Sequence, residues 1–335
     1  MTLLLNSKQK ASESSFLTSI IICTRGRCRD LANTLESLSR VEVPSHLWAE
    51  LLVVENGVKG SAEVATASFR HNRITARYLF EAVPGKSNAL NRAIAESNGR
   101  ILLFTDDDVR FPSDWVRCMC EAIHTGRADA VAGGVKLAPH LLRPWMNHTH
   151  RAWLASTADY LSPESPSEMC GANMALSRKV IDKIGGFDPE LGPGVTGGGE
   201  ESLLTWQLKK AGFKLASALD VQVEHHLDPE RLRYKSWINA ARLQGETRAY
   251  LMHHWFHQRM QHPSLMRLYY FTKLSFRRAC EGVRNPDDEG IAPWELSYIQ
   301  DMAKCARFVQ ERRRARNYIL HGLRKRTPDH KTVAI

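Results

Sequence analysis

Apolar and polar positions in the first hundred residues follow two alternating patterns. Short apolar runs rich in β-branched residues alternate with segments in which apolar residues recur every three or four positions. The first pattern is typical of buried strands and the second of amphipathic helices. We therefore expect strands at 16–23, 51–54, 74–80 and 101–104, separated by helices at 29–38, 61–69 and 87–96. This alternation predicts an α/β fold with a doubly wound, mostly parallel sheet.

The later sequence changes from mixed to helical patterns. Strands are expected at 130–137, 169–176 and 214–223, and an amphipathic helix at 200–211 with Leu203, Leu204 and Leu208 on one face. Beyond them, helices are expected at 237–257, 265–280 and 293–320. The pattern therefore predicts a helical C-terminal extension after the sheet.

Charge divides the chain near the same place. The sequence has 46 Lys+Arg and 36 Asp+Glu, a formal net charge of +10. Residues 228–335 hold 21 basic and 11 acidic residues, whereas the 25 basic and 25 acidic residues before them cancel. We expect an N-terminal tail at 1–15, one α/β domain at 16–227 and a basic helical region at 228–335.

Composition limits the class of protein. With 335 residues, 43% of them hydrophobic and 24% charged, the chain resembles soluble globular proteins. No apolar stretch approaches the roughly 20 residues that span a bilayer. The first residues lack the pattern of a signal peptide, so we expect a cytoplasmic protein. The seven cysteines have no CxxC spacing, and we expect them to be reduced.

Three adjacent aspartates form the most informative motif. Asp106, Asp107 and Asp108 follow the apolar run 101–104, at the end of an expected strand. Ligands of doubly wound folds bind outside the carboxyl ends of the strands. Three carboxylates there repel one another unless a cation shares them, and a divalent cation bridging to a phosphate would suit. A solvated acidic turn is the alternative interpretation.

Two further motifs carry candidate chemistry. Gly197, Gly198 and Gly199 precede Glu200 and Glu201, which open an expected helix. Carboxylates at a helix start complement the helix dipole, but a glycine run costs chain entropy. A flexible loop that presents a general base to a substrate hydroxyl explains both features. The third motif, EHH at 224–226, follows the last expected strand, where a histidine could complete a metal site.

Taken in order, the motifs resemble those of the family 2 glycosyltransferases, which have the GT-A fold. The resemblance covers residues 17–250. It rests on SIIICTRGRCRDLANTLESL (19–38), LLVVENG (51–57), PGKSNALNRAIAESNGRILLFTDDDV (84–109), GANMALSRKVIDKIGGFDPELGPG (171–194), GGGEESLLTWQLKKAGF (197–213) and VQVEHH (221–226).

The resemblance implies a site for a nucleotide-sugar. Thr24 and Arg25 end the first strand, where the family holds the base and ribose, and Glu55 takes the place of a base-contacting aspartate. Lys86 and Asn91 lie in the segment that lines the donor diphosphate. Asp106 and Asp107 complete the donor-binding residues implied by the resemblance, which are Thr24, Arg25, Glu55, Lys86, Asn91, Asp106 and Asp107.

The resemblance also implies a metal site and a catalytic base. Asp106 and Asp108 match the DXD motif, and His225 matches the third ligand of Mn²⁺ or Mg²⁺ in preference to His226. Glu201 matches the catalytic base of the family's ED motif, with Glu200 as the alternative. On the acceptor side the matching residues are Gly171, Ala172 and Asn173, and Phe187-Asp188 matches a loop beneath the leaving group.

The expected function is metal-dependent, inverting transfer of a sugar from a UDP-, GDP- or dTDP-linked donor to a hydroxyl of a glycan, a lipid-linked molecule or another acceptor, in cell-surface or exopolysaccharide synthesis. A nucleotidyltransferase that forms nucleotide-sugars is one alternative, although 24–27 only faintly match its phosphate loop. A non-catalytic scaffold with a GT-A-like fold is another, and the intact acidic motifs argue against it.

The basic region from 228 onward has three interpretations. Its arginines can form solvated faces of a helical bundle. Alternatively, 312–314 and 324–326 flank apolar Tyr318, Ile319 and Leu320, as expected for a peripheral protein on an anionic membrane at the inner membrane face. The third interpretation is binding of an anionic acceptor polymer. No nucleic-acid motif accompanies the charge, so no nucleic-acid partner is expected.

Overall fold

The computed structural model of the chain describes residues 16–282 and 284–326, so the expected N-terminal tail at 1–15 lies outside the described residues. The chain divides into two compact units. The sheet unit consists of Met1–Asp182 and Gly212–Pro229, and the helical unit of Lys183–Ala211 and Glu230–Ile335. The division at 227 expected from charge stays a prediction.

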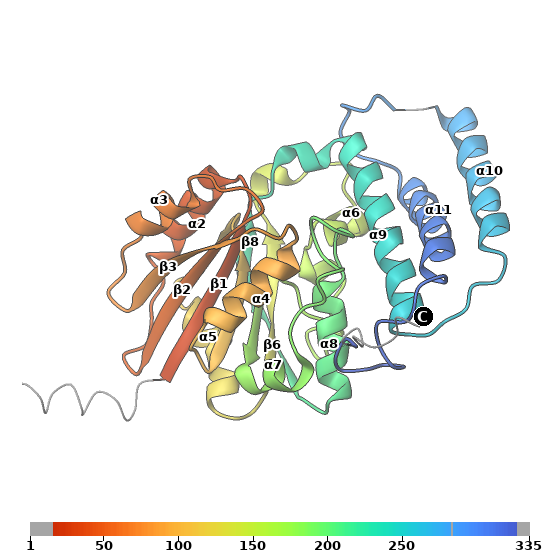
Figure 1. Ribbon diagram of the computed structural model, residues 1–335. Helices are drawn as coiled ribbons and strands as arrows, with labels where there is room; N and C mark the ends of the chain where they lie inside the picture. The colour runs from red at the N-terminus through yellow and green to blue at the C-terminus, as the bar shows by residue number, and fades with distance from the viewer. Residues whose placement is uncertain (1–15, 283, 327–335) are drawn as a thin grey trace, which may run out of the picture. The chain divides into compact units, whose positions relative to one another are not determined.

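The sheet unit contains one eight-stranded sheet, ordered β3-β2-β1-β4-β7-β6-β8-β5 (Figure 1). The strands β1 to β4 are parallel, as the alternating pattern predicts, whereas β7 runs antiparallel to both β4 and β6. The strands are β1 (Phe16–Thr24), β2 (Leu47–Asn56), β3 (Ile74–Glu81), β4 (Ile101–Asp106), β5 (Val109–Arg110), β6 (Ala130–Leu137), β7 (Asn173–Ser177) and β8 (Leu215–His225).

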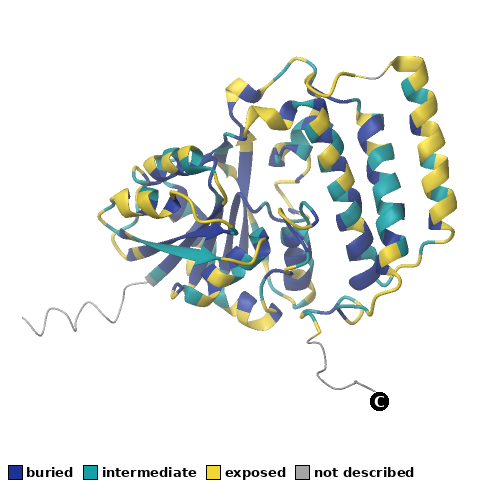
Figure 2. Cartoon of the chain, turned by 45° about the horizontal axis from the view of Figure 1, so that its top comes forward, coloured by how far each residue is buried: buried dark blue, intermediate teal, exposed yellow. Residues whose placement is uncertain are grey.

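Helices cover the sheet because its strands are apolar on both faces. Ile20 and Ile22 of β1 belong to a core cluster that includes Leu31 and Leu35 of α2. Side chains alternate along a strand, so Ile21 lies on the opposite face of the sheet. Figure 2 shows the inner strands of the sheet in the dark blue of buried residues, whereas β3 at its edge is mostly of intermediate burial. The helices of the sheet unit are α2 (Cys28–Leu38), α3 (Ala62–Ser68), α4 (Lys86–Glu96), α5 (Trp115–His124) and α6 (His148–Trp153), and its short 3₁₀ helices are η1 (Pro139–Leu141) and η2 (Thr157–Asp159). The helix α7 (Arg178–Ile184) and the 3₁₀ helix η3 (Pro229–Leu232) contain residues of both units.

Two strand ends define the edge of the sheet that matters for function. The parallel strands β1 and β4 place Cys23 beside Asp106, so residues that follow the two strands share one edge. The two-residue strand β5 then pairs with the end of β8, with Val109 opposite His225. Residues more than 100 positions apart in the sequence are therefore neighbours at this edge.

The helical unit is built mainly from four helices, which are α8 (Glu200–Lys210), α9 (Tyr234–His254), α10 (Pro263–Glu281) and α11 (Pro293–Glu311). The helix α11 packs against both α9 and α10. Buried Glu311 pairs with His254 of α9 at 2.9 Å and with Arg307 at 2.5 Å. Among the described residues, no helix combines the length and the apolar character needed to cross a membrane.

The structure corrects two details of the C-terminal region, namely where its last helix ends and whether Tyr318 is exposed. The helix expected at 293–320 ends at Glu311, because the following chain folds back onto the rest of the helical unit. There Tyr318 is 2% exposed, and its hydroxyl donates to Asp188 Oδ2 at 2.8 Å. Tyr318 therefore cannot contact a membrane in this conformation, whereas Ile319 and Leu320 are exposed. Lys325 forms an ion pair with the same aspartate, and its Nζ lies 2.7 Å from Asp188 Oδ1.

All seven cysteines are free and lie within the described residues, as expected.

Candidate functional site

The three aspartates occupy the end of β4 with different degrees of burial. Asp106 is the last residue of β4 and is partly exposed, whereas Asp107 and Asp108 are 0% and 2% exposed. The backbone N–H of His226 donates to the carbonyl of Asp108 at 2.7 Å, which joins this turn to the end of β8. An exposed acidic turn, the alternative expected from the sequence, is therefore excluded for Asp107 and Asp108.

Asp106, Asp108 and His225 form a cluster with the geometry of a metal site. Each offers one ligand atom, and these atoms all lie within 4.8 Å of one another. His225 Nε2 is 3.2 Å from Asp108 Oδ1. Its other ring nitrogen, Nδ1, is buried without a hydrogen-bond partner within the described residues. Two carboxylates and an imidazole suit an ion of the Mn²⁺ type, so the residues present fit the expected metal.

Two cations balance the carboxylates. Arg27 contacts Asp107 and lies 2.6 Å from Asp108 Oδ2, and Lys86 Nζ lies 2.5 Å from Asp106 Oδ1. Burial raises the pKa of Asp107 to about 7, an effect that Arg27 opposes and the charge of Asp108 reinforces. Burial lowers the pKa of Arg27, but the three aspartates outweigh it and raise that pKa overall. The charges at this edge are therefore strongly coupled.

Arg27 was not among the residues singled out from the sequence. It stands in the stretch CTRGRCR with Arg25 and Arg29, and no local signal separates the three arginines. Gly26 has a φ of +66°, and the turn there separates exposed Arg25 from Arg27, which reaches the carboxylates.

Asp107 is directed into the protein. Thr24 Oγ1 donates to Asp107 Oδ2 at 2.5 Å, and Thr34 Oγ1 donates to the carbonyl of Asp107 at 2.7 Å. Thr24 is itself buried. These contacts join the ends of β1 and β4 to α2, and they give Thr24 and Asp107 a structural role in this conformation. Their expected contact with a nucleotide stays a prediction.

Glu55 is completely buried at the end of β2. The hydroxyl of Tyr78, from the neighbouring strand β3, donates to Glu55 Oε2 at 2.8 Å. Burial, together with the hydrogen bond to Glu55, raises the pKa of Tyr78 to about 12. A Cβ at Gly60 would lie 2.8 Å from Glu55 Oε1, so the loop after β2 closes tightly over this carboxylate. Tyr78 was missed by sequence reasoning because only the pairing of β2 and β3 places it there.

The segment expected to line the diphosphate begins α4. Asn56 Nδ2 donates to the carbonyl of Val83 at 2.8 Å, and its Oδ1 accepts from the N–H of Gly85 at 2.8 Å. These two hydrogen bonds of Asn56 position the turn from which Lys86 extends to Asp106. Asn91 lies one turn further along α4 and is partly buried. The structure thus brings Lys86 into hydrogen-bond contact with Asp106, and the expected role of Asn91 stays a prediction.

The expected acceptor-side residues lie at the start of β7. Asn173 is 0% exposed, and its carboxamide accepts from Trp115 Nε1 and donates to the carbonyls of Gly134 and Val221. Ala172 is buried, and its carbonyl accepts from Thr105 Oγ1 at 2.9 Å. Gly171 is also buried. These residues support the sheet, and contact with an acceptor stays a prediction for all three.

The glycine run before α8 is a tightly packed turn within the helical unit. Gly197 and Gly199 have φ values of +91° and +87°. A Cβ at Gly197 would lie 2.6 Å from Leu243 Cβ, and one at Gly199 would lie 2.5 Å from Thr247 Cγ2. Close packing against α9 therefore explains the glycines, in place of the flexible loop expected from the sequence.

The two glutamates that open α8 differ in accessibility. Glu200 is 1% exposed, whereas Glu201 is partly exposed. Within the described residues, the carboxylate of Glu201 has no hydrogen-bond or ion-pair partner. Its accessibility suits a general base better than the burial of Glu200 does.

We predict that Gly199→Ala destabilises the protein and that Gly198→Ala does not. The first change adds a methyl against Thr247 at a positive φ, and it should lower the free energy of unfolding by about 1–3 kcal/mol. At Gly198 the nearest atom to a new Cβ is Gln244 Nε2, at 3.5 Å, an ordinary contact. Denaturant unfolding of both variants measures the difference. Equal stabilities would contradict the packed turn.

A second prediction concerns Arg27. Arg27→Met leaves Asp107 and Asp108 buried without their cation, and it should lower the free energy of unfolding by about 2–3 kcal/mol in the absence of metal. Mn²⁺ should restore part of the loss, because a cation bound at the cluster would compensate the charge of Asp108. Thermal unfolding with and without Mn²⁺ measures this. Arg25→Met, two residues away at an exposed position, is the control. An unchanged melting temperature for Arg27→Met would count against the charge balance described above.

Comparison with known proteins identifies the family of the chain. A model described as "Glycosyl transferase family 2" matches residues 19–185, about half of the chain. The chain belongs to the family 2 glycosyltransferases. The matched range holds the aspartates together with Thr24, Arg27, Glu55 and Lys86, whereas His225 and Glu201 follow it. The mostly parallel sheet and its flanking helices fit the GT-A fold.

Relatives of this glycosyltransferase include the succinoglycan biosynthesis protein ExoM of Rhizobium meliloti (strain 1021), which is 28% identical over 187 residues. That match covers 52% of this chain and 59% of ExoM, so less than two thirds of the relative is matched. Among solved structures, the mannosyltransferase PcManGT from Pyrobaculum calidifontis, in complex with GDP-Man and Mn²⁺, has a TM-score of 0.54 at 16% identity, covering 86% of this chain and 69% of that one. GalNAc-T7 with UDP, GalNAc and Mn²⁺ has a TM-score of 0.50 at 14% identity, covering 90% and 56%. At these identities the likeness shows the fold.

Proposed function

We propose that the chain transfers a sugar from a nucleotide-sugar to a hydroxyl of its acceptor, with inversion at the anomeric carbon and dependence on a divalent metal. The observation that carries this proposal is the cluster of Asp106, Asp108 and His225 at the carboxyl edge of the sheet, with Lys86 beside it. Family membership and the Mn²⁺ present in two structural neighbours support it.

The residues of the sheet unit have separate roles in this proposal. Asp106, Asp108 and His225 hold Mn²⁺ or Mg²⁺, which when bound supplies Lewis-acid neutralisation of charge on the leaving diphosphate. Lys86 exchanges its pairing with Asp106 for a diphosphate oxygen, as a point charge can. Arg27 pairs with Asp107 and Asp108 and offsets part of their negative charge in the free protein. Thr24, Arg25, Glu55 and Asn91 contribute to the nucleotide pocket.

The catalytic base is assigned to Glu201. Its carboxylate takes the proton from the acceptor hydroxyl as the oxygen attacks the anomeric carbon opposite the leaving group. A direct displacement of this kind inverts the centre and needs no nucleophile from the enzyme. Glu201 is chosen over Glu200 because it is accessible and lies in the first turn of α8 at the matching motif position.

Donor and acceptor are assigned by class. Two structural neighbours are complexes with GDP-Man and with UDP, and dTDP-sugars stay candidates. The relative ExoM is named for succinoglycan biosynthesis, which favours a glycan or lipid-linked acceptor in exopolysaccharide synthesis. We further propose that the enzyme acts in the cytoplasm at an anionic membrane surface, which its basic C-terminal region contacts.

A thermal-shift screen tests the donor site. UDP, GDP, dTDP and CMP are each added with and without Mn²⁺, and one diphosphate is expected to raise the melting temperature only with metal. Saturation at 100 times Kd stabilises a folded protein by about 2.7 kcal/mol, which is measurable. Absence of any metal-dependent shift would refute the donor site.

A further inference from the structure

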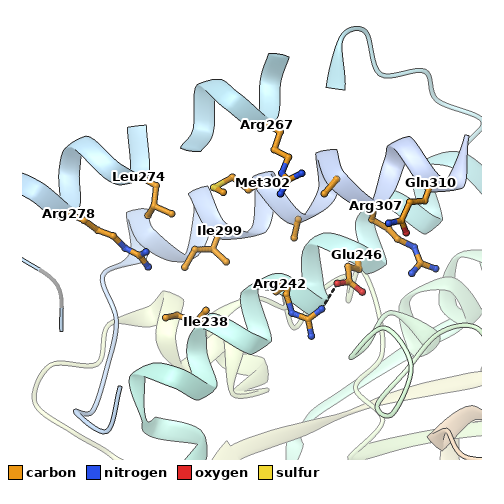
Figure 3. Close-up of a pocket in the computed structure, with 12 residues that line it drawn as sticks. Ile238, Arg242, Glu246, Arg267, Leu274, Arg278, Ile299, Met302, Arg307 and Gln310 are labelled. Carbon is orange, nitrogen blue, oxygen red and sulfur yellow. Dashed lines mark hydrogen bonds and ion pairs between the residues drawn. The ribbon is translucent and has the colours of Figure 1, made fainter. Parts of the chain in front are cut away.

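A cavity lies among the three long helices of the helical unit. Its volume is about 410 Å³, within the range of small-molecule sites. Each helix contributes residues at helical spacing, such as Ile238 and Arg242 from α9 and Ile299 and Met302 from α11. Figure 3 shows Leu274 and Arg267 extending from α10 toward α11. The apolar part of the lining consists of Ile238, Leu274, Ile299, Met302, Ala303 and Ala306.

Four arginines surround this apolar lining, and three of them are neutralised. Arg242 pairs with Glu246 at 2.5 Å, Arg278 with Glu295 at 2.6 Å, and Arg307 with Glu311 at 2.5 Å. Arg267 has no acidic partner within the described residues. An apolar cavity beside one uncompensated guanidinium suits a molecule with a hydrocarbon chain and an anionic head.

The outer face of α10 indicates where such a molecule would come from. Of the 19 residues of α10, only Pro263 and Leu274 are buried, and Figure 2 shows most of this helix in the yellow of exposed residues. Leu265, Leu268, Tyr269 and Phe276 are 54–71% exposed and recur at helical spacing on the side opposite Leu274. The helix has four basic residues, and its single acidic residue is Glu281. An exposed apolar stripe on a basic helix is typical of contact with an anionic bilayer.

We propose that the cavity binds the hydrocarbon chain of an anionic membrane lipid, whose head pairs with Arg267. This inference deepens the membrane contact of the proposed function, since it names the element and the ligand class. It does not depend on the donor site. The bundle of α9, α10 and α11 acts as a lipid-binding site, and the stripe on α10 lies in the bilayer interface.

Calorimetric titration of the full chain with dodecyl phosphate, kept below its micelle concentration, tests the cavity. One molecule should bind per chain, and inorganic phosphate and dodecyl maltoside should bind far more weakly. Arg267→Glu should weaken dodecyl phosphate about tenfold or more, because it reverses the charge that meets the head. Ala306→Trp should abolish binding by filling the cavity. Lys273→Glu makes the same charge change on the same helix outside the cavity and should leave Kd unchanged.

Three results would overturn the proposal. Inorganic phosphate binding as tightly as dodecyl phosphate would reveal a simple anion site. Equal weakening by Lys273→Glu and Arg267→Glu would reveal nonspecific charge attraction. Full binding to Ala306→Trp would place the ligand outside the cavity.

Pelleting with vesicles tests whether the anionic ligand of the cavity comes from a bilayer or from solution. The protein should pellet with phosphatidylcholine vesicles containing phosphatidylglycerol, and less with phosphatidylcholine alone or after Arg267→Glu. Binding of dodecyl phosphate without pelleting would refute the membrane source. The metal-dependent nucleotide shift should be unchanged in Ala306→Trp, so failure of the lipid site and failure of the donor site give different results.

Discussion

Asp108→Asn is expected to reduce sugar transfer on the order of 1000-fold and to abolish the Mn²⁺-dependent stabilisation by the donor nucleotide. Asp108 is 2% exposed and faces both His225 and Arg27, so it is the most enclosed of the three proposed ligands. An amide keeps the shape of the side chain but loses the charge that a divalent ion requires. Steady-state transfer and thermal shift with nucleotide and Mn²⁺ measure the two effects.

The fold should survive this change. Three adjacent carboxylates repel one another, and the charge of Asp108 contributes to the raised pKa of Asp107, so removing it relieves part of the repulsion. The control is Asp114→Asn, an exposed aspartate of the same unit that pairs with Arg117. It should keep full transfer. An Asp108→Asn protein that retains metal-dependent nucleotide binding would show that the metal is held elsewhere.

Glu201→Gln is expected to lower transfer by about 100- to 10,000-fold while donor binding is kept, because only the proton acceptor is removed. The measurement pairs kcat with the nucleotide-dependent thermal shift, which should match that of the unaltered protein. A loss of both would indicate a role in binding or folding instead.

Glu200→Gln is the matched comparison at the adjacent position. Glu200 is buried at the first turn of α8, so its replacement should lower the melting temperature more than it lowers kcat. If Glu200→Gln abolished transfer at an unchanged melting temperature and Glu201→Gln did not, the assignment of the base would be wrong.

Much of the fold could be predicted because its signals are local. The strands β1, β2, β3 and β4 and the helices α2, α3 and α4 start and end within a few residues of their expected ranges. Alternation of these elements also predicts which edge of the sheet carries the ligands. The family model confirms the family that the motifs resemble, whereas the roles of the candidate site residues stay predictions.

Other features depended on contacts that no local pattern encodes. The glycine run at 197–199 suggested mobility, but its conformation follows from the approach of α9. Tyr318 was expected at the surface, but the chain after α11 returns to Asp188, and Tyr318 is buried there. In both cases the contacting residues come from a segment that is distant in the sequence. The local sequence pattern around the glycines or around Tyr318 would be the same whether or not that contact formed.

The sequence by itself therefore determined the α/β class, the positions of most helices and strands, and the acidic edge where chemistry is expected. These follow from side-chain periodicity and from backbone preferences, which act over a few residues. The tertiary structure alone decided that Arg27, rather than Arg25, balances the aspartates and that Tyr78 meets Glu55. Each of these contacts joins different strands or loops, and strand register and packing set such contacts because they bring distant segments within a few ångströms.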